Sequence, residues 1–187
     1  CLAERLAELC TSRGAAAEIL PQEGAGNHML ATFRALQPDV GGPALLLGHF
    51  DTVWPLETIR ERPFRVDGQK AFGPGAYDMK GGLVMALEAL RLLRDAGLAP
   101  RRDVICLFNS DEEVGSGSSR EIIEAHARRA GYVLGLEPTL PDGAIKTQRK
   151  GVGRLVMRII GRAAHSGAEP EKGVSAVEEL ARQVLDL

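Results

Sequence analysis

Short apolar runs alternate with amphipathic stretches along most of the chain. Apolar runs bounded by glycine, proline or polar residues predict strands, at residues 16–19, 28–33, 43–48, 103–109 and 132–136. Apolar residues at three- and four-residue spacing predict helices, at residues 1–13, 80–95 and 118–129. This alternation predicts an α/β fold, in which a mostly parallel sheet is flanked by helices on both faces.

One segment between the predicted strands has the pattern of a hairpin. Residues 64–72 carry Asp67-Gly68 at their centre, and Asp-Gly is a favoured two-residue turn. The glycine-rich residues 73–78 that follow predict an irregular loop.

The pattern changes near residue 150. Residues 154–160 alternate partly and predict a longer strand, residues 161–173 are rich in turn formers, and a helical pattern begins at Val174. We therefore expect one domain over residues 1–150 and the first part of another over residues 151–187. The sequence lacks an initiating methionine and begins and ends inside helical patterns, so we expect a fragment of a longer protein.

Composition excludes several classes of protein. The net charge is −2 and the basic residues are dispersed, which argues against a nucleic-acid partner. No apolar run approaches the roughly 20 residues of a membrane span, and no secretory signal opens the sequence. Three cysteines, among them Cys106 in an apolar run, form no disulfide or zinc pattern, and we expect buried thiols. We expect a cytoplasmic protein, or a periplasmic or secreted one if a signal precedes this sequence.

Residues able to bind metal follow the predicted strands. His49 and Asp51 come at the end of the apolar run 43–48, and acidic residues end later segments: Asp78, Glu112, Glu113 and Glu137. The carboxyl ends of parallel strands meet at one edge of a sheet. Carboxylates crowded there repel one another unless a cation is present, and a nitrogen ligand among carboxylates suits Zn²⁺, Mn²⁺ or Co²⁺.

Five motifs, in order, resemble those of the M20 family of metallopeptidases, and most closely its glutamate carboxypeptidase branch. The motifs are Gly48-His49-Phe50-Asp51-Thr52-Val53, Gly73-Pro74-Gly75-Ala76-Tyr77-Asp78-Met79-Lys80-Gly81-Gly82, Asp111-Glu112-Glu113-Val114-Gly115-Ser116, Glu137-Pro138-Thr139 and Ala164-His165-Ser166-Gly167. The resemblance implies a zinc exopeptidase-like catalytic domain over residues 1–150. It also implies that residues 151–187 begin an α+β lid or dimerisation domain.

The resemblance implies a centre of two zinc ions in the complete subunit. His49 and Glu137 are expected on one zinc and Glu113 on the other, with Asp78 bridging both. The family's last metal ligand and its contacts to the substrate carboxylate match nothing in this sequence. The fragment is therefore expected to have little or no activity.

The resemblance also implies three residues that act on the reaction without holding zinc. Asp51 is expected to orient the His49 imidazole, and Glu112 to serve as the general base for the zinc-bound water. His165 is expected to stabilise the oxyanion from the partner subunit, which implies a homodimer. The peptide bond after Asp78 is often cis in this family.

The expected reaction is hydrolysis of the amide bond next to a C-terminal, glutamate-like amino acid in a small peptide or N-acyl amino acid. An N-acyl-amino-acid deacylase, a non-catalytic dimerising or binding fragment and, less favoured, a phosphoesterase remain alternatives. Trp54 lines the substrate entrance or packs in the fold, and we expect His28 and His126 to be surface or structural residues.

Overall fold

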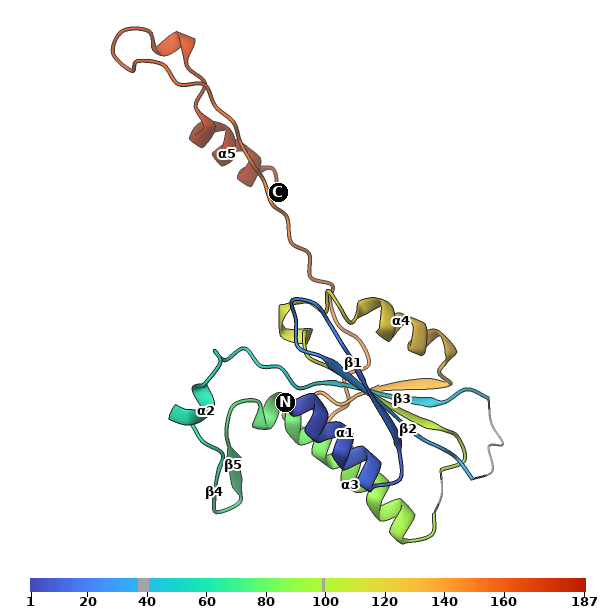
Figure 1. Ribbon diagram of the computed structural model, residues 1–187. Helices are drawn as coiled ribbons and strands as arrows, with labels where there is room; N and C mark the ends of the chain where they lie inside the picture. Colours follow the sequence, from blue (N-terminus) through green and yellow to red (C-terminus); the bar gives the residue numbers. More distant parts are fainter. Residues whose placement is uncertain (37–40, 99) are drawn as a thin grey trace. The chain divides into compact units, whose positions relative to one another are not determined.

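The computed structural model describes residues 1–36, 41–98 and 100–187 (Figure 1). The chain divides into two compact units, residues 1–145 and 146–187, and each is described by itself. A catalytic domain that ends near residue 150 stays a prediction.

The first unit is built on a five-stranded sheet. Its strands in chain order are β1 (Ala16–Leu20), β2 (His28–Phe33), β3 (Ala44–His49), β6 (Val104–Asn109) and β7 (Tyr132–Gly135). Their order across the sheet is β1-β2-β6-β3-β7. β3 is parallel to both β6 and β7, whereas β2 is antiparallel to both of its neighbours. Only β2 therefore runs against the other strands, and the predicted α/β fold with a mostly parallel sheet is confirmed.

Helices α1 (Leu2–Ser12) and α3 (Gly81–Asp95) cover one face of this sheet, and α4 (Arg120–Arg129) covers the other (Figure 1). Alternate residues of the central strands supply the two cores. Met29 and Phe108 pack with Leu83 on the first face, whereas Leu30 and Leu107 pack on the second. Each such apolar side chain contributes about 1.5–3 kcal/mol when fully buried. The helices on both faces thus bury most of β3 and all of β6, whereas β7 lies at the sheet edge with its residues exposed.

Cys10 and Cys106 lie in the core, whereas Cys1 is exposed, and all three are free thiols. The expectation of a buried thiol is therefore wrong for Cys1. Cys10 on α1 and Cys106 on β6 are fully buried in the same apolar core. Burial raises the pKa of Cys10 to about 11 and raises that of Cys106 further, so both thiols stay protonated at neutral pH. The predicted buried thiol at Cys106 is confirmed.

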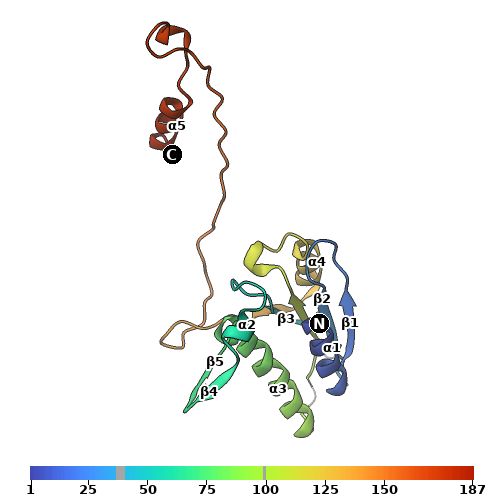
Figure 2. The same ribbon diagram turned by 60° about the vertical axis from the view of Figure 1, so that its left-hand side comes forward.

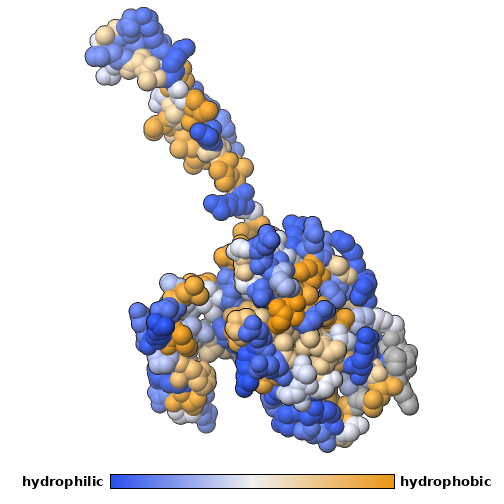
Figure 3. All heavy atoms as spheres, viewed as in Figure 1, coloured by the Kyte–Doolittle hydropathy of each residue, from blue (hydrophilic) through white to orange (hydrophobic). Residues whose placement is uncertain are grey.

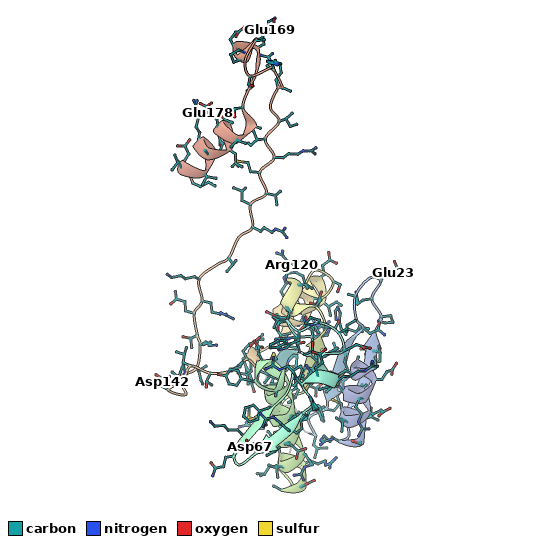
Figure 4. All side chains as sticks on the ribbon, turned by 90° about the vertical axis from the view of Figure 1, so that its left-hand side faces the viewer. Glu23, Asp67, Arg120, Asp142, Glu169 and Glu178 are labelled. Atoms are coloured by element: carbon teal, nitrogen blue, oxygen red, sulfur yellow. The ribbon has the colours of Figure 1, made fainter. Side chains whose placement is uncertain are left out.

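Between β3 and α3 the chain forms an arm beside the sheet (Figure 1). The arm comprises the short helix α2 (Thr58–Glu61) and the antiparallel pair β4 (Arg65–Asp67) and β5 (Lys70–Phe72). Gly68 adopts a φ of +57° in the turn, and Asp67 lies at the tip of this hairpin (Figure 4). The predicted hairpin is confirmed, whereas α2 was not predicted.

The second unit has little regular structure (Figure 2). It contains a 3₁₀ turn η3 (Pro170–Lys172), helix α5 (Ala176–Leu185) and one isolated bridge between Arg162 and Val174. The strand predicted at residues 154–160 is wrong. A strand needs a neighbour to accept its backbone hydrogen bonds, and no described residue pairs with this segment. None of the described helices is long and apolar enough to cross a membrane.

Candidate metal centre

The carboxyl ends of β3, β6 and β7 meet at one edge of the sheet. The register pairs His49, the last residue of β3, with Asn109, the last residue of β6. On the other side of β3, the N–H of Leu136 donates a hydrogen bond of 2.9 Å to the carbonyl of Leu47. The pairing of β7 with β3 therefore extends to the residue before Glu137. The parallel part of the sheet therefore brings the three motifs of these strand ends together, as the sequence predicted.

One buried imidazole lies within reach of four carboxylates. The Nε2 atom of His49 lies 3.2 Å from Oδ1 of Asp78, 3.4 Å from Oε1 of Glu137 and 3.9 Å from Oε2 of Glu112. Its other nitrogen, Nδ1, lies 3.3 Å from Oδ1 of Asp51, without the geometry of a hydrogen bond. His49 is thus the centre of the acidic cluster.

The ligand atoms fall into two groups that share His49. One group contains Asp78 and Glu113, the other Glu112 and Glu137, and the ligand atoms of each lie within 4.8 Å of one another. In addition, Nδ1 of His49 and Oδ1 of Asp51 are buried without a hydrogen-bond partner among the described residues. One imidazole and several carboxylates form a donor set that fits a divalent ion such as Zn²⁺. The residues present therefore fit a metal centre.

The electrostatics of the cluster favour a bound cation. Burial raises the pKa of Glu113, and repulsion from Asp78, Glu112 and Asp51 raises it further against the opposing effect of His49. The motif that contains Asp78 also contains Lys80, to which the sequence assigned no role. Burial lowers the pKa of Lys80, and the negative charges of Asp51 and Glu113 oppose that shift. Lys80 is therefore a basic residue close to the acidic cluster.

Asp51 connects two of the motifs. Its Oδ2 atom accepts a hydrogen bond of 3.0 Å from the backbone N–H of Glu113, while its Oδ1 faces the imidazole. The side chain is 17% exposed, which is low for a carboxylate. Asp51 thereby ties the end of β3 to the 3₁₀ turn η2 (Glu112–Val114) that carries both glutamates.

The loop before α3 places Asp78. The segment η1 (Ala76–Lys80) begins after Gly75, which has a φ of +70°. The Asp78–Met79 peptide bond is cis, as the family resemblance implied. Met79 is buried, and its sulfur accepts a hydrogen bond of 3.2 Å from the N–H of His49. The Asp78 side chain is left more than half exposed, facing the imidazole.

A network of buried polar side chains connects β2 with the residues around η2, and no pattern in the sequence predicted it. His28 is fully buried at the start of β2, and its Nδ1 accepts a hydrogen bond from the N–H of Ser110. Its Nε2 lies 3.1 Å from Oγ of Ser118, and that hydroxyl donates to Asp111 over 2.8 Å. Because the only proton of Ser118 Oγ goes to Asp111, Nε2 of His28 is the donor in its own contact. The expectation that His28 is structural is confirmed.

Asp111 is the anchor of this network. Burial alone would raise its pKa, but hydrogen bonds from Ser119, Ser118 and Asn109 together lower it below its ordinary value. The carboxylate is therefore ionised at neutral pH and holds both ends of the turn that contains Glu112 and Glu113. No periodic pattern in the sequence marks contacts between β2 and this turn, so only the structure reveals them.

His165 lies in the second unit. Its side chain is exposed, and its Nδ1 accepts hydrogen bonds of 3.2 Å from the N–H groups of Gly167 and Ala168. It is not among the residues that the sheet edge brings together, and its role in the reaction stays a prediction.

The fold and this cluster define an α/β protein with a candidate divalent-metal centre at the carboxyl edge of its sheet. The sequence pattern of the family described as "Peptidase family M20/M25/M40" matches residues 45–186. The chain belongs to this family.

Individual relatives agree with this assignment. The chain is 42% identical over 146 residues to carboxypeptidase G2 of Pseudomonas sp. (strain RS-16), an alignment that covers 78% of this chain and 35% of that protein. It is 32% identical over 169 residues to acetylornithine deacetylase of Salmonella arizonae (strain ATCC BAA-731 / CDC346-86 / RSK2980), with coverage of 86% and 41%. The chain therefore spans less than half the length of these curated relatives.

A solved structure shows the same fold. The M20 family metallo-carboxypeptidase Sso-CP2 from Sulfolobus solfataricus superimposes with a TM-score of 0.62 and 24% sequence identity. The superposition covers 75% of this chain and 33% of that one.

Proposed function

We propose that the protein containing this chain is a zinc-dependent hydrolase that cleaves the amide bond next to a C-terminal, glutamate-like amino acid. The observation that carries this proposal is the position of His49, whose buried imidazole lies within 3.9 Å of carboxylates from three separate segments. The 42% identity to carboxypeptidase G2 supports the choice of reaction. Small peptides and N-acyl amino acids are the proposed substrates.

Four residues are proposed as ligands of the metal centre. His49 and Glu137 would hold one Zn²⁺ and Glu113 a second, and Asp78 would contribute its carboxylate to the same centre. Their nitrogen and oxygen donors suit Zn²⁺, and Co²⁺ or Mn²⁺ would also be accepted. When bound, zinc lowers the pKa of a coordinated water to about 7 and polarises the scissile carbonyl.

Glu112 is proposed as the general base. The Glu112 side chain is 47% exposed, although its carboxylate lies 3.9 Å from the buried His49 imidazole. The carboxylate is therefore accessible to a water molecule next to the proposed metal ligands. Glu112 would take a proton from the attacking water and transfer it to the leaving amine. Asp51 would hold the orientation of the His49 imidazole from its Nδ1 side.

His165 is proposed to stabilise the oxyanion of the tetrahedral intermediate from the partner subunit of a homodimer. Its exposed side chain leaves Nε2 accessible, because the hydrogen bonds of the 165–168 turn use Nδ1. Gly167 and Ala168 thereby fix the direction of the ring.

A hydrolysis assay on the protein that contains this chain tests the proposal. Cleavage of N-acyl-L-glutamate should stop after chelation and return with Zn²⁺. Glu112→Gln should reduce kcat by at least about 10²-fold, the scale of one general base, while the zinc content stays unchanged. Glu113→Gln, the matched change at the neighbouring residue, should reduce the zinc content. Hydrolysis that resists chelation, or zinc loss in Glu112→Gln alone, contradicts the proposed mechanism.

A deacylase is the second candidate, favoured by the 32% identity to acetylornithine deacetylase. Both reactions cleave an amide bond at a similar centre and differ in the amino acid that is released. Parallel assays with N-acetyl-L-glutamate and N-acetyl-L-ornithine distinguish them: faster cleavage of the ornithine compound selects the deacylase.

A further inference from the structure

A second cavity lies against the arm, next to the metal centre. It has a volume of about 570 Å³, within the range of small-molecule sites. Its wall is aromatic, proline-containing and cationic, and it is lined among others by Trp54, Arg62, Arg65, Phe72, Pro74 and Tyr77. Figure 3 shows apolar surface on the arm, where such residues are exposed to solvent.

This cavity adjoins the proposed metal ligands. A smaller cavity of about 170 Å³ is lined by Asp78 and Glu113. Both cavities are lined by Trp54, Gly73, Ala76 and Tyr77, so they share a wall. A substrate whose amide bond lies at the metal centre can therefore extend along Trp54 into the larger cavity.

Two guanidinium groups line the larger cavity, and their surroundings differ. The Arg62 guanidinium lies 4.5 Å from the centre of the Trp54 ring, and that of Arg65 lies 4.0 Å from the Phe72 ring. Arg65 also forms an ion pair of 3.6 Å with Asp67. Among the described residues, no carboxylate lies within ion-pair distance of Arg62, although Glu61 also lines the cavity.

The contact of Arg62 with Trp54 leaves the arginine able to bind an anion. A cation–π contact with a ring face uses the positive charge of the guanidinium and leaves its planar set of N–H groups able to donate hydrogen bonds. Those groups form paired hydrogen bonds with a carboxylate. The neighbouring aromatic walls favour a flat group over a branched aliphatic one, because flat rings make the larger contact.

We propose that this cavity binds the part of the substrate beyond the scissile amide bond, and that it selects a planar group with a negative charge, which Arg62 binds. This inference rests on the proposed function, because the ligand of the cavity is part of the proposed substrate. Arg62 acts as a specificity residue, and the aromatic walls supply the contact for the ring.

Binding of small probes to the metal-free chain tests the cavity without any catalysis. Trp54 is the sole tryptophan of the sequence, so its fluorescence reports on this wall. The probes are benzoate, its neutral counterpart benzamide, and acetate as an anion without a ring. Removing metal with a chelator prevents benzoate from binding at the metal centre, and calorimetry repeats each titration with an independent signal.

We expect saturable binding of benzoate that is tighter than that of benzamide or acetate. Arg62→Gln should weaken benzoate binding about tenfold, the effect of one lost charged hydrogen-bonding group. Arg62→Lys should weaken it by less, because the charge remains but the planar fork is lost. Arg65→Gln is the matched control in the same cavity and should change affinity by no more than about twofold, since the nearby carboxylate of Asp67 repels an anion that approaches that arginine.

Several results would overturn the inference: no saturable binding of benzoate, equal binding of benzoate and benzamide, or unchanged affinity in Arg62→Gln. Thermal unfolding of each variant checks that the fold is intact, and Arg62 is exposed, so its replacement should leave the unfolding temperature unchanged. Benzoate binding in a protein that hydrolyses no amide would support the cavity and contradict the proposed function, so the two failures are distinct.

Discussion

At the scale of single residues, the site depends on histidines that the fold removes from water. The Nε2 atom of His49 faces the carboxylates of the acidic cluster, and its Nδ1 atom faces Asp51. His28 has hydroxyl and backbone partners, with Nδ1 accepting from the N–H of Ser110 and Nε2 directed at Oγ of Ser118. Burial at both positions fixes the ring orientation, and each ring then fixes the segment that it contacts.

The pH dependence of stability tests the role of His28. Burial lowers its pKa, although the charges of Asp111 and Asp51 and a hydrogen bond that the ring donates to Ser118 oppose the shift. The unfolded chain therefore binds a proton more readily than the folded chain once the pH falls below about 6.5. The stability that neutral His28 provides is fully present above that pH and declines below it.

We expect His28→Gln to cost about 1 kcal/mol at neutral pH, and the gap to wild type to narrow as the pH falls from about 7.5 to about 5.5. Urea unfolding of the metal-free chain at both pH values measures this gap. His165→Gln serves as the control, because that histidine is exposed in the second unit. A gap that stays constant with pH would show that His28 does not titrate as described.

The meeting of the candidate site residues was largely predictable from the sequence, and the contacts that support them were not. His49, Glu112, Glu113 and Glu137 each follow a recognisable strand, so their meeting at one edge follows from the parallel register. The bonds of His28 to residues more than 80 positions away have no local pattern. Long-range polar contacts of this kind depend on the packed structure alone.

At the scale of elements, the first turn of α3 packs closely against Leu136, which lies just after β7 and next to Glu137. A Cβ atom at Gly82, in the first turn of α3, would lie 2.0 Å from the carbonyl oxygen of Leu136. The backbone of that strand end cannot move away freely, because Leu136 is hydrogen-bonded to Leu47. Only glycine at position 82 permits this approach.

Gly82→Ala should destabilise the chain by about 1–3 kcal/mol, even though alanine is the better helix former by about 1 kcal/mol. Gly135→Ala is the control within β7, since nothing lies within 4 Å of a Cβ atom there. Chemical denaturation of the two variants measures the difference. Equal stability of the two variants would contradict the packing described here.

The elements themselves were predicted where they pair or pack within the chain. The strands of the sheet have apolar patterns and pair with neighbouring strands, and helices α1, α3 and α4 have amphipathic patterns and pack on the sheet. The strand predicted at residues 154–160 has the pattern without a neighbour, and it does not form. Hydrogen-bonding partners, which a local pattern does not specify, decide this difference.

At the scale of the whole molecule, the first unit contains a cationic, aromatic cavity that shares one wall with the cavity at the candidate metal centre. Trp54 and η1 contribute to both cavities, whereas β5 contributes to the larger one alone. The arm thus supplies the side chains that we propose to discriminate among substrates.

Zinc titration of the metal-free chain tests most directly whether this sheet edge binds a metal. We expect saturable binding that raises the free energy of unfolding, by about 2.7 kcal/mol when zinc is in 100-fold excess over its dissociation constant. Asp78→Asn should weaken binding at least about tenfold, whereas Asp67→Asn at the hairpin tip should leave it unchanged. Absence of saturable binding, or equal binding by the two variants, would show that the acidic cluster around His49 is not a zinc site.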